Sequence, residues 1–285
     1  MKKILVTGGA GFIGSNLIKI LLQQDYEVYS LDNYSTGSTN NHIKGANYIN
    51  DDINNINLIN QLKSKIDICF HLAANARVQP SFDESSKYFY SNVSGTLQIM
   101  EWAEKTKSKV IYAGSSSKHH DPYDSPYAMY KFLGEEVCKL YKKSFDVNVE
   151  IARFYNVYGP KENLDEINGN VIGIWRAKIK KGEPLPIVGD GNQRRDFTHV
   201  NDIVDGLIRI AFSDLINKDA WELGTGINYS INELFDFFKE KFDVDSVNIP
   251  DQKGNYRSTL RVNDDMLSKL SWEPTDRLRD HIQTL

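Results

Sequence analysis

Glycines at positions 8, 11 and 14 follow a short apolar run, Ile4–Val6, and constrain the fold more than any other feature of this chain. They permit a tight turn from a strand into a helix and a close approach of the backbone to a ligand. Apolar residues then recur at helical spacing over 12–22. A strand, a glycine turn and an amphipathic helix therefore follow in the order that a dinucleotide-binding turn requires.

A second predicted strand, Glu27–Leu31, ends in Asp32. Its carboxylate lies where a ribose 2′-hydroxyl needs an acceptor, and unpaired N–H groups at the start of the preceding helix would face a pyrophosphate. Because an acid here repels a 2′-phosphate, the sequence favours NAD over NADP. The alternative is a glycine turn without a ligand beside a surface carboxylate.

The charge balance and the cysteines exclude several classes of protein. The 285 residues include 34 Lys and Arg and 38 Asp and Glu, mixed along the chain, so we expect no nucleic-acid partner. The apolar run Leu17–Leu22 contains Lys19 and follows the glycine turn, so it is neither a signal peptide nor a membrane span. We expect a cytoplasmic protein with no membrane partner. Cys69 and Cys138 cannot form a disulfide framework or a zinc site, and we expect buried free thiols.

Strand-like and helical patterns alternate through the first half of the chain. Strands are predicted at Ile4–Thr7, Val28–Leu31, Tyr48–Ile49, Ile66–Phe70, Val110–Ala113 and Val149–Ala152, with helices around 12–24, 55–64, 86–105 and 126–145. This βαβ series predicts an α/β fold with a doubly wound parallel sheet of the Rossmann type. We expect an NAD-binding Rossmann domain over 1–160. A smaller carboxyl-terminal substrate-binding lobe over 161–285 would be interleaved with it and have too few strands for a sheet of its own.

Tyr127 and Lys131 are four residues apart at the predicted start of a helix, so both side chains lie on one face. An ammonium beside the phenol, with a nicotinamide cation near, would lower the pKa of Tyr127 towards neutrality and make it a general base. The strand before this helix ends in three serines, 115–117, where a hydroxyl could polarise a substrate alcohol or carbonyl. An ordinary helix pair and an ordinary serine turn are the alternatives.

Together these motifs resemble the extended short-chain dehydrogenase/reductases, specifically the nucleotide-sugar epimerase/dehydratase family with its UDP-hexose 4-epimerases. The motifs come in that family's order: Thr7–Gly14, Asp32-Asn33, Asp52-Ile53, His71–Ala74, Asn92, Gly95-Thr96, the serines, Tyr127 and Lys131, Arg153–Pro160 and Gly189–Val200. The resemblance implies NAD as cofactor, a nucleotide-diphosphate sugar as substrate, and a homodimer.

The same resemblance assigns roles to individual residues. It implies that Ser115, Tyr127 and Lys131 are catalytic and that no metal is needed. The residues implied for NAD binding are Gly8, Gly11, Phe12, Ile13, Gly14, Asp32, Asn33, Asp52, Ile53, Leu72, Ala73, Ala74, Asn92, Tyr127, Lys131 and Phe154. Those implied for substrate binding are Ser116, Ser117, Asn156, Asn170, Val171, Ile187, Arg195 and Thr259. Arg195 also has a physical case, because a guanidinium fork suits phosphate oxygens; a surface ion pair with Asp196 or Asp202 is the alternative.

The chain departs from the family pattern in two places. After the serines it reaches Tyr127 quickly, so the substrate-facing loop is shortened, and His119 and His120 there lack a third ligand and are interpreted as loop residues. A charged pair that the family carries around a later glycine is missing at 252–255. Lys253 or Arg257 could supply the second diphosphate contact instead.

These observations favour an NAD-dependent epimerase of a nucleotide-diphosphate sugar, acting at C4 through a transient 4-keto sugar. A 4,6-dehydratase comes second, because it needs an acid and a base where this chain has Ser116 and Ser117, and serine substitutes poorly for a carboxylate in proton transfer. A 4-keto reductase or a nucleotide-sugar dehydrogenase would use the same motifs. A non-catalytic NAD-binding regulator would be expected to lose Tyr127 or Lys131, and both are present.

Overall fold

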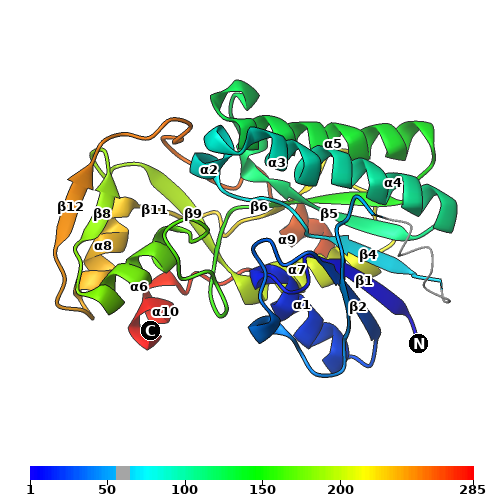
Figure 1. The fold of residues 1–285 in the computed structure, drawn as a ribbon, viewed down its shortest axis with the longest axis horizontal. Helices are drawn as coiled ribbons and strands as arrows, with labels where there is room; N and C mark the ends of the chain where they lie inside the picture. The colour runs from blue at the N-terminus through cyan, green and yellow to red at the C-terminus, as the bar shows by residue number, and fades with distance from the viewer. Residues whose placement is uncertain (56–64) are drawn as a thin grey trace.

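The computed structural model describes residues 1–55 and 65–285, which form two lobes side by side (Figure 1). The larger lobe is built on a seven-stranded sheet in the order β10-β6-β5-β4-β1-β2-β3, in which every neighbouring pair is parallel. The strands are β1 (Lys3–Thr7), β2 (Glu27–Asp32), β3 (Asn47–Asn50), β4 (Ile68–His71), β5 (Lys109–Ser115), β6 (Val149–Phe154) and β10 (Trp221–Leu223). The predicted doubly wound parallel sheet is confirmed.

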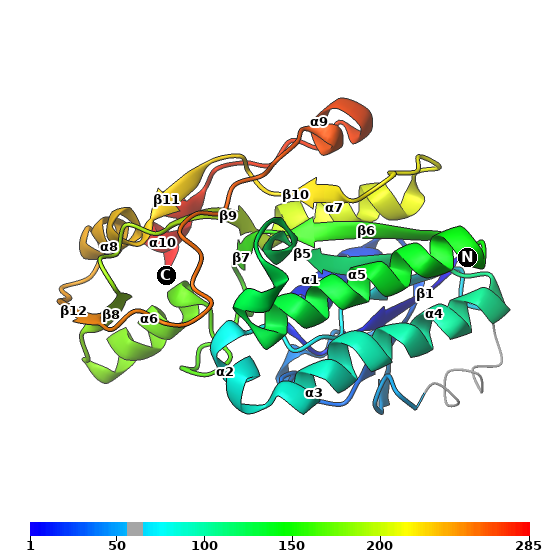
Figure 2. The same cartoon turned by 90° about the horizontal axis from the view of Figure 1, so that it is seen from above.

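Alternate residues of β1 point to opposite faces of the sheet, and helices cover both faces. Ile4 and Val6 pack in one core cluster with α1 (Phe12–Gln23) and α7 (Val200–Phe212), whereas Leu5 packs in a second cluster with α4 (Gly95–Thr106) and α5 (Pro126–Ser144). Figure 2 shows α4 and α5 lying side by side. Burial on both faces explains the nearly continuous apolar runs that identified the strands in the sequence.

One predicted helix differs in detail from the structure, and another lies almost wholly outside the described residues. The helix predicted over 86–105 consists of α3 (Ser85–Phe89), a π-helical segment (Tyr90–Ser94) and α4. The helix predicted around 55–64 falls almost entirely on 56–64, outside the described residues. Cys69 and Cys138 are buried and free, as predicted.

The smaller lobe has sheets of its own, so the expectation of too few strands was wrong. One sheet has the order β11-β9-β7 and the other pairs β12 with β8. Their strands are β7 (Asn156–Tyr158), β8 (Leu185–Val188), β9 (Arg194–His199), β11 (Asn228–Ser230) and β12 (Ser246–Ile249), and the helices of this lobe are α6 (Val171–Lys181), α8 (Ile231–Lys239) and α10 (Leu278–Thr284). The chain returns to the larger lobe in α9 (Asp265–Leu270), which packs on β10 and α7. Most of these strands are only three or four residues long, too short for a recognisable alternation of apolar and polar residues.

The order of the strands locates the place where a ligand can bind. The chain leaves β1 towards β2 on one side, and β4 returns on the other side of β1, so the carboxyl ends of β1 and β4 flank the point where the direction of winding reverses. Open parallel sheets bind ligands in the crevice at such a point. The glycine turn follows β1 there.

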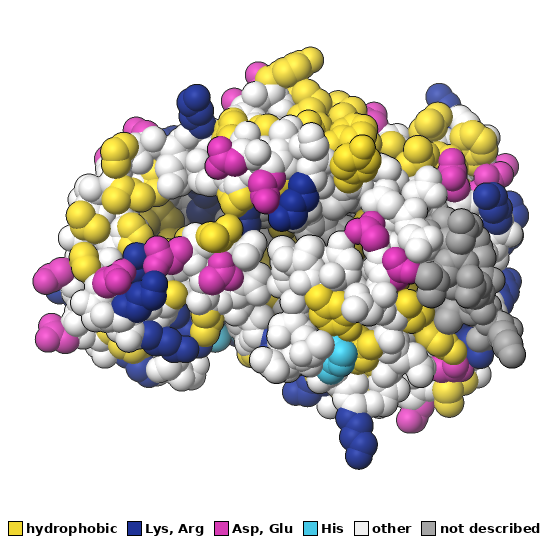
Figure 3. Space-filling view, viewed as in Figure 1, with side chains coloured by type: hydrophobic (Ala, Val, Ile, Leu, Met, Phe, Trp, Pro, Cys, Tyr) yellow, Lys and Arg dark blue, Asp and Glu magenta, His cyan; other side chains and the backbone are white. Residues whose placement is uncertain are grey.

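The surface carries no concentration of one charge on the face in Figure 3, where acidic and basic side chains are mixed over both lobes. No helix among residues 1–55 and 65–285 is long and apolar enough to cross a membrane.

Candidate active site

The glycine turn is packed so tightly that two of its positions exclude any side chain. Gly8 has φ +72°, and a Cβ atom on it would lie 2.9 Å from the Ala73 backbone nitrogen. A Cβ atom on Gly14 would lie 2.2 Å from the Gly8 carbonyl oxygen. Among the described residues, the N–H groups of Phe12 and Ile13 have no acceptor, so they can bind an anion at the start of α1.

Asp32 lies at the end of β2, buried against the turn. Its two carboxylate oxygens accept hydrogen bonds from the backbone N–H groups of Ala10 (2.9 Å) and Tyr34 (2.8 Å), which fix its orientation beside the glycines. Asn33 donates a hydrogen bond to Asp52 (2.7 Å). Burial opposes ionisation of Asp52, but hydrogen bonds from Asn54 and Asn33 outweigh it and lower the pKa of that carboxyl.

The segment after β4 lies directly beside the glycine turn. Leu72 and Ala73 donate backbone hydrogen bonds to the carbonyl and hydroxyl oxygens of Thr7. Asn92, implied for NAD binding, is buried and exchanges two hydrogen bonds of 2.9 Å with the backbone of Asn75. The turn, Asp32 and this segment therefore come together. Of the other residues implied for NAD binding, Ile53 is buried against Gly95. Phe154 is the last residue of β6.

The three predicted catalytic residues also come together. Tyr127 donates a hydrogen bond to the Ser115 hydroxyl at 3.1 Å. Lys131, one turn further along α5, donates to the carbonyl oxygen of Ala113 and lies 4.6 Å from the centre of the Tyr112 ring. Ser125 caps α5 and accepts a hydrogen bond from Ala128 N–H, so the helix begins where it presents Tyr127 and Lys131 to the end of β5.

Burial governs the protonation of this group in the protein without a cofactor. Burial raises the pKa of Tyr127, and the hydrogen bond with Ser115 and the charge of Arg77 only partly counteract it. Burial also lowers the pKa of Lys131 to about 8. Lys131 alone therefore does not lower the pKa of Tyr127 to near 7, because burial disfavours both the charged ammonium and the charged phenolate.

Ser116 and Ser117 follow in the 3₁₀ helix η4 (Ser116–His119). Ser117 is buried, and among the described residues its hydroxyl oxygen has no hydrogen-bond partner. His119 contacts Glu222, whereas His120 stacks on Tyr256 with ring centres 3.9 Å apart, so the two histidines face different partners.

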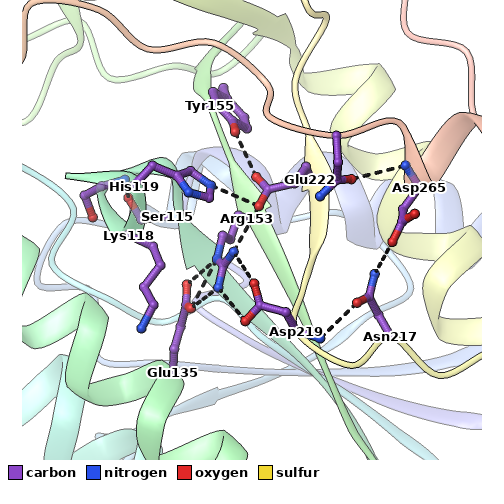
Figure 4. A network of polar contacts seen from close by, with 12 residues as sticks. Ser115, Lys118, His119, Glu135, Arg153, Tyr155, Asn217, Asp219, Glu222 and Asp265 are labelled. Atoms are coloured by element: carbon purple, nitrogen blue, oxygen red, sulfur yellow. Dashed lines mark hydrogen bonds and ion pairs between the residues drawn. The ribbon is translucent and has the colours of Figure 1, made fainter.

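A buried polar network holds η4 in place, and the sequence analysis missed it (Figure 4). Arg153 pairs with Glu135 (2.8 Å) and Glu222 (3.0 Å), and Glu222 in turn contacts His119 (3.0 Å) and Tyr155 (2.8 Å). Burial opposes the charge of Arg153, but the bonds from its carboxylate partners outweigh it and raise its pKa. An arginine directly after the apolar run Val149–Ala152 was the available signal, since a buried guanidinium requires carboxylate partners.

The residues implied for the substrate are more scattered. Asn156 donates a hydrogen bond to the hydroxyl of Thr259 (3.2 Å), and both lie near β9. Asn170 caps α6, where it accepts from Gly173 N–H (2.8 Å), and Val171 is the first residue of that helix. Ile187 is buried in the core cluster of the smaller lobe. Their roles towards a substrate remain predictions.

Arg195 contacts neither of the carboxylates considered as its alternatives. It donates hydrogen bonds to the carbonyl oxygen of Arg194 and the side chain of Asn255, while Asp202 pairs with Arg277. Burial lowers the pKa of Arg195 to about 10. Arg257 instead forms two hydrogen bonds with the carboxylate of Asp190 (2.9 and 3.0 Å). Of these two guanidinium groups, Arg257 is therefore the one whose charge is already paired.

The residues present fit NAD: the glycine cradle would be filled by a Cβ atom, free N–H groups begin α1, and an acid ends β2. Residues 4–224 match the NAD dependent epimerase/dehydratase family, and the chain belongs to it. The family fixes the class of chemistry, NAD-dependent conversion of nucleotide sugars, and leaves the particular reaction open.

Individual relatives carry out different reactions within this class. The chain is 33% identical to a Methanocaldococcus jannaschii protein provisionally named UDP-glucose 4-epimerase (98% of this chain, 96% of the relative). It is 30% identical to UDP-glucuronic acid decarboxylase 6 of Arabidopsis thaliana (98% and 86%). The crystal structure of UDP-glucuronic acid 4-epimerase from Bacillus cereus with UDP-glucuronic acid and NAD superposes with a TM-score of 0.90 at 28% identity (99% and 96%).

Proposed function

We propose that this chain is an NAD-dependent epimerase that inverts C4 of a nucleotide-diphosphate sugar through a transient 4-keto sugar. The observation that carries the proposal is the hydrogen bond between Tyr127 and Ser115, with Lys131 on the same face of α5 and serines at 116 and 117.

Tyr127 would take the proton from the reacting sugar hydroxyl, and Ser115 would hold the same oxygen by a hydrogen bond. Because burial raises the pKa of Tyr127, the phenol needs a further positive charge close by before it ionises at neutral pH. Bound NAD supplies that charge in its oxidised form, together with the capacity to accept and return a hydride. Lys131 would hold the ribose and tune the tyrosine.

Ser116 and Ser117 support epimerisation over dehydration. Elimination of water requires a second acid and base beside the sugar, and hydroxyls with ordinary alcohol acidity perform that role poorly. A 4,6-dehydratase or a 4-keto reductase is therefore the second candidate. A regulator without activity is disfavoured by the assembled Ser115–Tyr127 contact. The homodimer and the cytoplasmic location expected from the sequence are part of the same proposal.

The test is to incubate the purified protein with UDP-glucose and, separately, with UDP-glucuronic acid, the sugars in the names of its relatives. We expect at least one of them to equilibrate with its C4 epimer without added NAD and without lasting growth of NADH absorbance. Stoichiometric NADH would indicate a dehydrogenase, a requirement for added NADH a reductase, a 4-keto-6-deoxy product a dehydratase, and release of CO₂ a decarboxylase. Any of these results in place of epimerisation contradicts the proposal.

A further inference from the structure

Arg77 lies at the junction of the two lobes and was not identified in the sequence. It precedes α2 (Val78–Asp83) and is held from behind by the two hydrogen bonds between Asn75 and Asn92. Its side chain crosses the junction, where Nε donates a hydrogen bond to the carbonyl oxygen of Asn168 at 2.7 Å. The guanidinium is therefore fixed from both lobes.

No carboxylate among the described residues pairs with Arg77, and its two terminal nitrogens donate no hydrogen bond there. The carboxylates whose charges act on the pKa of Arg77 are Glu162 and Asp165. Glu162 pairs with Arg176 (3.0 Å), and Asp165 accepts hydrogen bonds from the backbone N–H groups of 167 and 168. Burial lowers the pKa of Arg77. An anion that pairs with the guanidinium would therefore offset the unfavourable free energy of burying its charge.

Arg77 also lies beside the predicted catalytic base. Ser81 of α2 accepts a hydrogen bond from Tyr127 N–H at 3.2 Å, which docks α2 on the start of α5. Burial raises the pKa of the Tyr127 phenol, and Arg77 is the charged group that counteracts this rise. The positive charge of Arg195, by contrast, opposes the rise in the pKa of Tyr256 and contributes to the lowered pKa of His120. The two guanidinium groups therefore have different neighbours.

We propose that Arg77 binds a carboxylate on the hexose, so that the substrate is a nucleotide sugar whose sugar is acidic. The inference rests on the proposed function, which places the reacting hydroxyl at Tyr127, and on the diphosphate contact expected from the sequence at Arg195. A guanidinium with two free nitrogens matches the two oxygens of a carboxylate. The hydroxyl of Ser117, buried without a partner among the described residues, offers a further donor next to the catalytic serine.

The experiment compares UDP-glucuronic acid with UDP-glucose, which differ in the carboxylate alone, on the wild-type protein, Arg77→Gln and Arg77→Lys. Both dissociation constants and turnover are measured. We expect the wild type to bind UDP-glucuronic acid at least about 10-fold more tightly than UDP-glucose, and Arg77→Gln to weaken binding of the acidic sugar about 10- to 100-fold. The dissociation constant of UDP-glucose should change less than about 3-fold, because UDP-glucose makes no charged contact with Arg77. Turnover should fall on both sugars, since the charge of Arg77 also favours ionisation of Tyr127. Arg77→Lys should fall between, since it keeps the charge and loses the planar fork.

Arg279→Gln is the control for loss of a positive charge, because Arg279 pairs with Glu240 on the surface. A wild-type protein that binds both sugars equally well would overturn the inference. Equal losses of affinity for both sugars in Arg77→Gln would also overturn it, because Arg77 would then only stabilise the contact between the lobes. If Arg77→Gln does not fold, the inference is tested by the affinities of the wild type and Arg77→Lys for the two sugars. Tight, Arg77-dependent binding of UDP-glucuronic acid without epimerisation would uphold this subsite and refute the proposed function. Epimerisation of UDP-glucose without preference would do the opposite.

Discussion

The predicted NAD side of the site is built mainly on backbone that follows β1, β2 and β4, with the Asp32 carboxylate beside it. The predicted substrate side is built on side chains, some of which reach across the two lobes. On the NAD side, Gly8 touches Ala73 because β1 and β4 are neighbours in one sheet. On the substrate side, the Arg195 side chain donates to Asn255, which lies 60 residues further along the chain. Arg77 reaches Asn168, 91 residues away, across the two lobes.

The difference has a consequence for each side. A cradle made of backbone depends on the absence of side chains and tolerates no substitution at its tightest points. A pocket made of long side chains can change specificity by single substitutions while the fold stays intact. The predictions below test whether the two sides respond in these different ways.

The largest effect is expected at the catalytic group, which lies between the two sides. Tyr127→Phe removes the hydroxyl that contacts Ser115, so turnover of an identified substrate should fall by about 10²- to 10⁴-fold. Binding of NAD and the melting temperature should change little, because the ring remains. Steady-state kinetics and calorimetry measure both, and turnover near that of the wild type would place the general base elsewhere.

A pair of glycine substitutions tests the backbone side. Gly8 and Gly182 have similar positive φ values, +72° and +67°, but only Gly8 has atoms within 4 Å of an added Cβ. Gly182→Ala should cost about 1–2 kcal/mol of unfolding free energy from strain alone and leave NAD affinity unchanged. Gly8→Ala should cost more and abolish NAD binding at concentrations that saturate the wild type. Equal behaviour of the two variants would mean that the turn does not hold the cofactor.

On the substrate side, Arg195→Ala should raise the dissociation constant of a nucleotide-diphosphate sugar about 10- to 100-fold with little change in melting temperature. Arg257→Ala should have the smaller effect of the two, because Arg257 is already engaged by Asp190. Isothermal titration of UDP with both variants separates them. A large fall in melting temperature with unchanged affinity for Arg195→Ala would make this residue structural.

The last effect concerns pH and a buried histidine of the larger lobe. Burial lowers the pKa of His71 to about 3, and His71 contacts Thr7 (2.8 Å) and Thr96 (3.1 Å). Between pH 6.5 and 4 the unfolded chain binds a proton here that the folded chain does not, so wild-type stability should fall on acidification by up to about 1.4 kcal/mol per pH unit from this group.

His71→Gln is the matching variant. It lacks this proton uptake, so its stability deficit, measured by urea unfolding at pH 7.5, should shrink as the pH falls to 4. A deficit that stays constant over this range would show that His71 does not remain neutral in the folded protein.

The sequence allowed the larger lobe and the catalytic group to be predicted because both depend on local patterns. Apolar strands, the glycine turn and the four-residue spacing of Tyr127 and Lys131 are visible without knowing any distant contact. The sheets of the smaller lobe, the Arg153 network and Arg77 were missed because each depends on partners brought together only by the fold. The rise that burial causes in the pKa of Tyr127 was also not foreseen, because burial cannot be read from spacing.

The proposed function makes one claim that a single measurement tests most directly: the hydrogen removed from C4 returns to C4 of the same sugar. UDP-glucose and UDP-glucuronic acid, each deuterated at C4, would be incubated with the protein, and the label in the products located by NMR and mass spectrometry. We predict that the C4 epimer forms with deuterium retained at C4. Loss of the label from the sugar, or its appearance at C6, would contradict the account, since the first is expected of a dehydrogenase and the second of a 4,6-dehydratase.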